Sequence, residues 1–293
     1  MKQLALTVGL LLLVTAVVGK DKEKKSKNTF IGLGLGGAQA GFVDPIQSPR
    51  VYSGYGLLTS IAIDRYRKGY QQYTQLQFSP VTVTNGSGSR FGENPATSYS
   101  LQVSSGWLWR IPAPLGRFKW YAGPVLQTFT RININPAFGN SSLGLMAHAG
   151  VGVASRIEFP FRLRDDRELR IWFLTFKRKE HRPLVAGWEC ELPLAGFHAR
   201  QPYAGLYNAI GNDPVGGILQ SLGENTRFAA VGSYWYFRQQ LYLHYYLRNG
   251  NALALGWNWN AYRLERDGFE ARSAFGGIQL SLKFRLDQNK LHR

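Results

Sequence analysis

Two histidines, His148 and His244, are the side chains of this sequence best suited to act as a catalytic base. A hydrolase needs a nucleophile within reach of such a base and a third group that orients the base. No serine stands two residues away from either histidine, so no nucleophile accompanies them on the same face of a strand. A serine on a neighbouring strand remains the alternative. The sequence therefore predicts no catalytic residue, although it leaves an enzyme open.

Metal and cofactor chemistry has little support either. The five histidines and the single cysteine, Cys190, do not have the spacing of metal ligands. Gly32, Gly34 and Gly37 match the three-glycine pattern of dinucleotide-binding loops. That pattern requires a helix that opens at the glycines, whereas here they lie inside an alternating stretch that Asp44 and a proline end. We predict no metal site and no cofactor.

The elements that must position any such chemistry are read from the alternation of apolar and polar residues. The clearest example runs from Ala274 to Leu286, where even-numbered residues are apolar or glycine and odd-numbered residues turn polar and basic. A period of two identifies a strand with different surroundings on its two faces. Strands of soluble proteins have around five or six residues, whereas a tilted strand that crosses a bilayer needs roughly nine to eleven. This length favours a transmembrane strand.

Similar stretches recur and predict an all-β fold, an antiparallel transmembrane β-barrel of about twelve strands. The predicted strands cover residues 30–42, 51–65, 70–84, 97–111, 118–135, 143–159, 168–177, 184–197, 227–237, 240–247, 252–264 and 274–286. An even number is what bacterial single-chain barrels require. The segment 200–225 is too long for a periplasmic turn, so it either folds inward as a plug or conceals a strand pair. Ten and fourteen strands are the alternatives.

If the apolar faces contact lipid, the opposite faces line the interior and gather polar and charged side chains. The interior candidates are Asp64, Arg110, His148, Arg156, Glu158, Glu189, Glu191, His244, Arg248, Lys283 and Arg285. Opposite charges in a narrow barrel pair with one another, because an unpaired charge away from water is unfavourable. Trp107, Trp109 and Trp120 flank a short turn, and we predict that they form an aromatic girdle at one membrane edge.

The N-terminal region predicts export. An early lysine, an apolar run from Leu4 to Val18 and a small residue before the first charges are typical of a signal peptide, residues 1–19. Residues 20–28 lack apolar side chains and are predicted to be a basic mobile leader. Residues 29–286 then form the barrel, and residues 287–293 form a C-terminal tail. A single cysteine cannot form an internal disulfide.

The composition fits an exported barrel, with 14% aromatic residues, 33 glycines and only 18% charged residues. The formal net charge of +17 would first suggest nucleic acid as a partner. An exported chain rarely meets nucleic acid, so we expect none. We expect the positive charge to contact outer-membrane lipid, anionic glycolipid or another envelope protein.

The predicted signal peptide, the long amphipathic strands and the paired tryptophans together resemble the outer-membrane β-barrel proteins of Gram-negative bacteria. The resemblance covers about residues 29–286 and implies a location in the outer membrane. Barrels of this class often end at an aromatic residue, whereas here Phe284 is followed by Leu286 and a tail. The His-x-Ser arrangement of outer-membrane phospholipases is missing, and so is the early Asn-Asp pair of the lipid A deacylases.

Three functions stay open on this evidence. The first is a binding or scaffold protein with an interior that is plugged or filled by side chains. The second is a small porin-like pore for anionic or hydrophobic solutes. The third is an outer-membrane lipid hydrolase. Barrels of roughly eight to twelve strands are mostly filled by their own side chains, and open aqueous channels belong to larger ones, which favours the first function.

Overall fold

The computed structural model describes most of the chain from the first predicted strand to the last. The described residues are 28–45, 48–85, 95–113, 116–136, 143–163, 168–171, 174–177, 182–200, 216, 220, 223–230, 234–266 and 269–286. The predicted signal peptide, all but the last residue of the leader, and the tail 287–293 lie outside them. In the part of the chain that the structure describes, no helix is long and apolar enough to cross a membrane.

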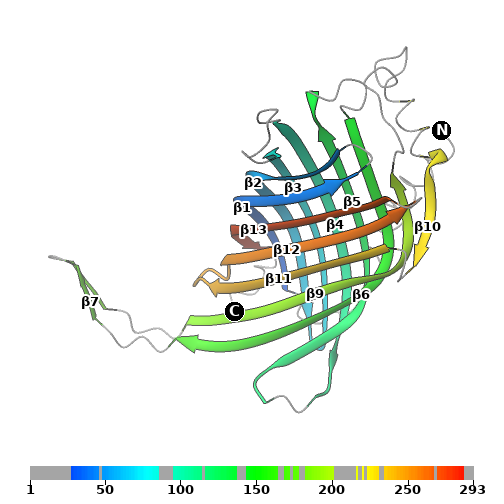
Figure 1. The fold of residues 1–293 in the computed structure, drawn as a ribbon. Coiled ribbons are helices and arrows are strands. Elements are labelled where there is room, and N and C mark those ends of the chain that lie inside the picture. The colour runs from blue at the N-terminus through cyan, green and yellow to red at the C-terminus, as the bar shows by residue number, and fades with distance from the viewer. Residues whose placement is uncertain are drawn as a thin grey trace.

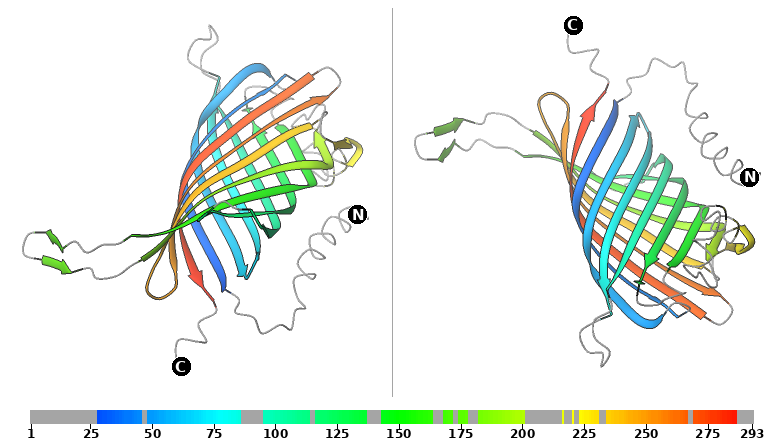
Figure 2. Two further views of the ribbon diagram at one scale, coloured as in Figure 1. Left: turned by 90° about the horizontal axis from the view of Figure 1, so that it is seen from below. Right: turned by 90° about the horizontal axis from the view of Figure 1, so that it is seen from above.

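Ten long antiparallel strands close into a barrel (Figures 1 and 2). In the order in which they pair, they are β1 (Asn28–Asp44), β2 (Ser48–Arg67), β3 (Tyr70–Thr84), β4 (Ala96–Ile111), β5 (Lys119–Ile134), β6 (Leu143–Leu163), β9 (Arg182–Arg200), β11 (Tyr234–Tyr246), β12 (Ala252–Arg266) and β13 (Phe269–Arg285). The last strand pairs with the first from Phe30 opposite Arg285 to Val43 opposite Arg272. Closure pairs each long strand with a neighbour on both sides over most of its length, as a membrane requires.

The predicted antiparallel barrel is confirmed, with the ten strands that the sequence left as an alternative to twelve. Residues 168–177 are not a barrel strand, because β7 (Glu168–Ile171) and β8 (Leu174–Lys177) pair only with each other in a separate hairpin. Residues 227–247 do not form two barrel strands either. A short strand, β10 (Thr226–Ala230), pairs with one part of β9, and β11 alone joins the barrel.

The outer wall is apolar and the inner wall is polar, as the alternation predicts. In β13, the side chains of Ile278 and Leu280 are 60% and 58% exposed on the outside, whereas Gln279 between them is 4% exposed on the inside. The same rule holds in β1, where Leu35 faces out. Gly34 faces in, and a Cβ atom there would lie 2.4 Å from a serine oxygen of β2. This glycine therefore permits close packing inside the barrel.

The two ends of the barrel differ. At one end, here called the terminal end, β1 begins and β13 ends, and β6 and β9 continue toward the β7–β8 hairpin (Figure 2). The opposite end, here called the far end, carries the connection between β9 and β11. With ten strands the segment 200–225 therefore belongs to the far end, not to the terminal end that twelve strands required. The predicted plug lies almost wholly outside the described residues.

Candidate functional site

Among the described residues, three groups of inward-facing side chains lie one above another in the barrel. A cluster of ion pairs fills the middle, a small polar cavity lies toward the terminal end, and aromatic side chains gather toward the far end. Each group is built by strands that are remote in sequence, because inward-facing residues of opposite walls meet across a narrow lumen.

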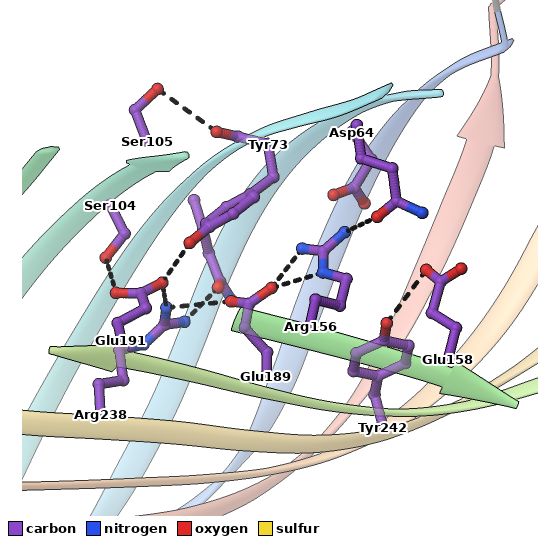
Figure 3. A network of polar contacts seen from close by, with 12 residues as sticks. Asp64, Tyr73, Ser104, Ser105, Arg156, Glu158, Glu189, Glu191, Arg238 and Tyr242 are labelled. Carbon is purple, nitrogen blue, oxygen red and sulfur yellow. Dashed lines mark hydrogen bonds and ion pairs between the residues drawn. The ribbon is translucent and has the colours of Figure 1, made fainter. Parts of the chain in front are cut away.

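Glu191 of β9 is the centre of the middle group (Figure 3). The hydroxyl of Tyr73 donates to it at 2.7 Å and that of Ser104 at 3.1 Å. Gln127 and Arg238 also donate to the same carboxylate. These four partners come from β3, β4, β5 and β11, so the contacts cross the lumen from several sides. A fully buried carboxylate is tolerated here because charged and neutral donors surround it.

A second ion pair lies beside the first. Arg156 of β6 donates from Nε to Glu189 of β9 at 2.7 Å and from Nη1 to Gln71 of β3 at 2.8 Å. Arg238 links the two pairs, because its Nη1 also lies 3.6 Å from Glu189. Its Nη2 donates to Gln75 of β3. The four charges sum to zero, and each is buried, so the cluster resembles a network in which every charge has a partner. We call Arg156, Glu189, Glu191 and Arg238 the central ion cluster.

Glycines make room for the tyrosines that reach this cluster. Gly106 lies opposite Tyr73 in the β3–β4 register, and a Cβ atom at Gly106 would lie 2.3 to 2.7 Å from that ring. Gly187 lies opposite Tyr242 in the same way, with the ring 2.1 to 2.4 Å from a Cβ atom. The two rings therefore lie flat over glycines of the neighbouring strand.

Toward the terminal end, the inner wall is polar and not completely filled. Lys283 donates to Asp64 at 2.7 Å, and Tyr242 donates to Glu158 at 3.3 Å. A cavity whose lining includes Asp64, Tyr242 and Lys283 has about 40 Å³ open to the centre of a water molecule. One water needs roughly 10 to 15 Å³ by this measure, so the cavity holds a few waters and no organic solute.

Toward the far end, aromatic and apolar side chains predominate, beside the buried ion pair of Arg200 with Asp44. The far-end cluster, as we call it, consists of Phe129, Met146, Ala229, Tyr234, Tyr236, Tyr262, Leu264 and Ala271. His148 of β6 stacks on Tyr234 with ring centroids 4.4 Å apart. The guanidinium of Arg131 lies 5.4 Å from the ring of Phe129 and 5.3 Å from that of Tyr262. One buried cation is thus surrounded by rings.

Most of the predicted interior residues lie on the inner wall. Those that are buried there are Asp64, His148, Arg156, Glu158, Glu189, Glu191 and His244. Lys283 and Arg285 are half-buried near the terminal end, where Arg285 donates to Asn28 at 2.6 Å. Arg110 and Arg248 are exposed at that end, so they do not line the closed interior.

The three tryptophans lie on the outer wall near the terminal end, on neighbouring strands. Trp109 is 51% exposed, and Trp107 and Trp120 are half-buried. The indole of Trp120 donates to Ser155 at 2.9 Å. Their position at one rim is the position of the predicted girdle, which remains a prediction about the membrane edge.

Sequence reasoning missed several side chains of the interior. Arg238 was missed because the polar residues Arg238–Gln240 are typical of a turn between two strands. In the structure these residues lie inside β11. Arg131 has an alternating pattern around it that could have placed it on the inner wall. Tyr73 and Gln127 carry no sequence signal, because their importance depends on which strands face each other across the lumen.

The two candidate bases, His148 and His244, are buried on the inner wall. No hydrogen bond joins a serine to His148 or His244 in the described part of the chain, and both ring nitrogens of His148 are buried without a partner. Among the same residues, no three histidine, cysteine, aspartate or glutamate side chains gather as metal ligands.

A closed antiparallel barrel with an apolar outer wall and a polar, salt-bridged interior defines a class of protein. The chain is an integral outer-membrane β-barrel protein. The fold thus places it in the outer membrane. Neither the central ion cluster nor the far-end cluster assigns a more specific role by itself.

No family model and no curated protein sequence matches this chain. Among solved structures, the outer membrane protease OmpT of Escherichia coli is similar with a TM-score of 0.43 and 9% identity, over 92% of this chain and 99% of that one. The transport unit of the Escherichia coli autotransporter AIDA-I has a TM-score of 0.35 and 6% identity, over 94% and 97%. Neisserial surface protein A has a TM-score of 0.29 and 7% identity, over 89% of this chain and 100% of that one. Likenesses this low carry no argument about activity.

Proposed function

We propose that this protein is a closed barrel that acts as a binding or scaffold component of the outer membrane, and that solutes do not pass through its lumen. The observation that carries the proposal is the central ion cluster. Its contacts join β3, β4 and β5 on one wall to β6, β9 and β11 on the other, at the level of Glu191. A pore at this level would have to break buried ion pairs, which is strongly unfavourable.

The ends of the barrel are then the parts that meet partners. In our proposal the terminal end faces the periplasm after export by the signal peptide 1–19, and the far end, with the long connection between β9 and β11, faces outward. Arg263 and Arg272 face outward at the far end and lie opposite each other on β12 and β13. Glu270 is their shared acidic partner, and Glu265 lies opposite Glu270, so two positive and two negative charges gather there. The two arginines are the groups that would meet anionic glycolipid, and another envelope protein is the alternative.

Single-channel recording in a planar bilayer tests the closed lumen. The wild-type barrel should insert and give no steady current steps. A variant in which Arg156, Glu189, Glu191 and Arg238 are all changed to alanine should conduct, because two charges of each sign leave together and no unpaired charge stays behind. If the fourfold variant does not fold, Arg156→Ala combined with Glu189→Ala serves in its place. Steady open currents from the wild-type barrel would contradict the proposal.

A further inference from the structure

One buried arginine of the interior lacks the partner that the other buried arginines have. The three paired ones are Arg156 with Glu189, Arg200 with Asp44, and Arg238 with Glu191. Arg131 is 1% exposed, and no carboxylate of the described residues forms an ion pair with it. Its Nη1 donates to the hydroxyl of Ser273, and its Nε is buried with no partner. A guanidinium has five N–H donors, and here Tyr262 is a second hydrogen-bond partner beside Ser273, whereas Nε has none.

The surroundings of Arg131 support a cation without neutralising it. Its guanidinium carbon lies 5.3 to 5.9 Å from the ring centroids of Phe42, Phe129 and Tyr262. Each cation–π contact contributes about 0.5 to 2 kcal/mol, whereas an isolated buried charge is unfavourable by much more. An anion that binds to the guanidinium would remove this imbalance, and a carboxylate fits its planar fork.

A second observation points to a ligand in the same region. Both ring nitrogens of His148 are buried without a hydrogen-bond partner. The ring of Tyr234 stacks on His148, and the hydroxyl of Tyr234 is also buried without a partner. A continuous series of rings joins this pair to Arg131, because Tyr236 lies 6.1 Å from Phe129 and Phe129 contacts the guanidinium. Apolar surface with a few unsatisfied polar groups is the usual lining of a small-molecule site.

The barrel wall next to these rings is incompletely paired. β11 pairs with β9 only from Arg238 opposite Glu191 onward, so Tyr234–Phe237 pairs with β12 alone. From Ala195, β9 pairs with β10 instead. Pro193, between the two regions, has no N–H to donate to a neighbouring strand. We call the unpaired boundary between β9 and Tyr234–Phe237 the seam.

The outer surface around the seam is apolar. Phe197 is 57% exposed, Phe228 63% and Trp235 45%. These side chains suit contact with lipid tails, so the outer side of the seam faces the membrane. Among the described residues, the first four of β11 pair with β12 alone, so the rings of the far-end cluster can separate most easily here.

We propose that the far end of the lumen binds an anionic amphiphile, a carboxylate on an apolar chain that comes from the membrane. The carboxylate pairs with Arg131, and the apolar chain lies along the far-end cluster after entering through the seam. This proposal goes beyond the proposed function and does not rest on it. The single-channel recordings do not test this proposal, and the binding measurement below does not depend on whether the lumen conducts.

Calorimetric titration of the full-length barrel in a non-ionic detergent, with decanoate below its micelle concentration, tests the site. Saturable binding at one site is expected, with affinity at least about tenfold weaker in Arg131→Gln, because hydrogen bonds to a charged group contribute roughly 1.5 to 3 kcal/mol. Arg117→Gln, at an exposed turn of the terminal end, removes the same charge and should bind decanoate like the wild type. Equal affinity in Arg131→Gln and the wild type would overturn the proposal, as would the absence of saturable binding.

Two further probes define the chemistry. Decanol has the chain without the charge, and acetate has the charge without the chain, so each should bind more weakly than decanoate. Equal binding of either probe would overturn the amphiphile as the ligand class. If Arg131→Gln does not fold, the wild-type unfolding midpoint decides instead. Decanoate should raise that midpoint, because a ligand of the folded state stabilises it, and decanol should not.

The route is tested by closing the seam. In a Cys190→Ser background, Leu192→Cys and Phe237→Cys place two thiols one position beyond the last paired residues of β9 and β11. Oxidation of this pair should slow decanoate association, followed by the fluorescence of Trp235, and reduction should restore the rate. Equal rates in both states would mean that the ligand enters from water at the far end, and would overturn the membrane route.

Discussion

At the scale of single residues, the interior shows which charges the fold can neutralise by itself. Glu189 and Glu191 are predicted from alternation, and each is surrounded by donors from other strands. Their partners could not be predicted, because the strands that face each other across a lumen depend on strand number and tilt. Arg131 is the exception among the buried arginines, and its lack of a carboxylate is visible only in the structure.

Glu191→Ala should destabilise the barrel by about 3 to 5 kcal/mol, because it leaves Arg238 buried without its main partner and removes the acceptor of three further donors. The midpoint of denaturant unfolding in detergent measures this loss. Glu270→Ala is the matched control, since its partners Arg263 and Arg272 are exposed and its loss should change the midpoint little. A Glu191→Ala midpoint equal to that of the wild type would refute the role of the cluster.

Gly106→Ala tests the packing under Tyr73. A Cβ atom would lie within 2.7 Å of a ring that is held by its hydrogen bond to Glu191, so the ring or the strand must shift. We expect a loss of about 1 to 3 kcal/mol in the free energy of unfolding. Gly37→Ala adds the same methyl group on the outer wall, where nothing lies within 4 Å, and should be neutral or slightly stabilising. If both variants unfold at the same midpoint, the packing account is wrong.

At the scale of elements, strands with a clean alternation were predictable and two regions were not. In β11, aromatic residues occupy both faces of the strand at Tyr234–Phe237. The polar residues Arg238–Gln240 that follow also occupy both faces. Gln239 points outward, where it accepts a hydrogen bond from the indole of Trp188 at 3.4 Å. Local pattern alone reads such a run as a turn. The long connection between β6 and β9 caused the opposite error. Its β7–β8 hairpin resembles a strand in sequence, so residues 168–177 were wrongly predicted to be a barrel strand.

Deletion of residues 164–181, with an Asn-Gly turn in their place, tests the separation of that hairpin from the barrel. β6 and β9 pair as far as Leu163 opposite Arg182, and β7 and β8 pair only with each other. The shortened chain should therefore fold with the same unfolding midpoint and the same mobility shift of the unheated protein in gel electrophoresis. Failure to fold would show that the hairpin contributes to the barrel itself.

At the scale of the whole molecule, one physical contrast accounts for the architecture. Outward side chains such as Ile278 meet hydrocarbon, and inward side chains such as Gln279 meet one another. The sequence predicts this contrast because its apolar residues recur with a period of two. A shift of one residue in the strand register would turn every side chain to the wrong face, so the fold must keep this register. Strand number does not follow from the period alone, because it depends on two regions where the period fails.

The filled lumen is the claim on which the proposed function depends, and the reactivity of a thiol at its centre measures it directly. In a Cys190→Ser background, Ser104→Cys places a thiol at a position that is 1% exposed and whose hydroxyl binds Glu191. Asn249→Cys at the exposed turn before β12 is the control. A charged, water-soluble maleimide should label the control at once and should label Ser104→Cys only after thermal unfolding. Rapid labelling of Ser104→Cys in the folded barrel would contradict the account.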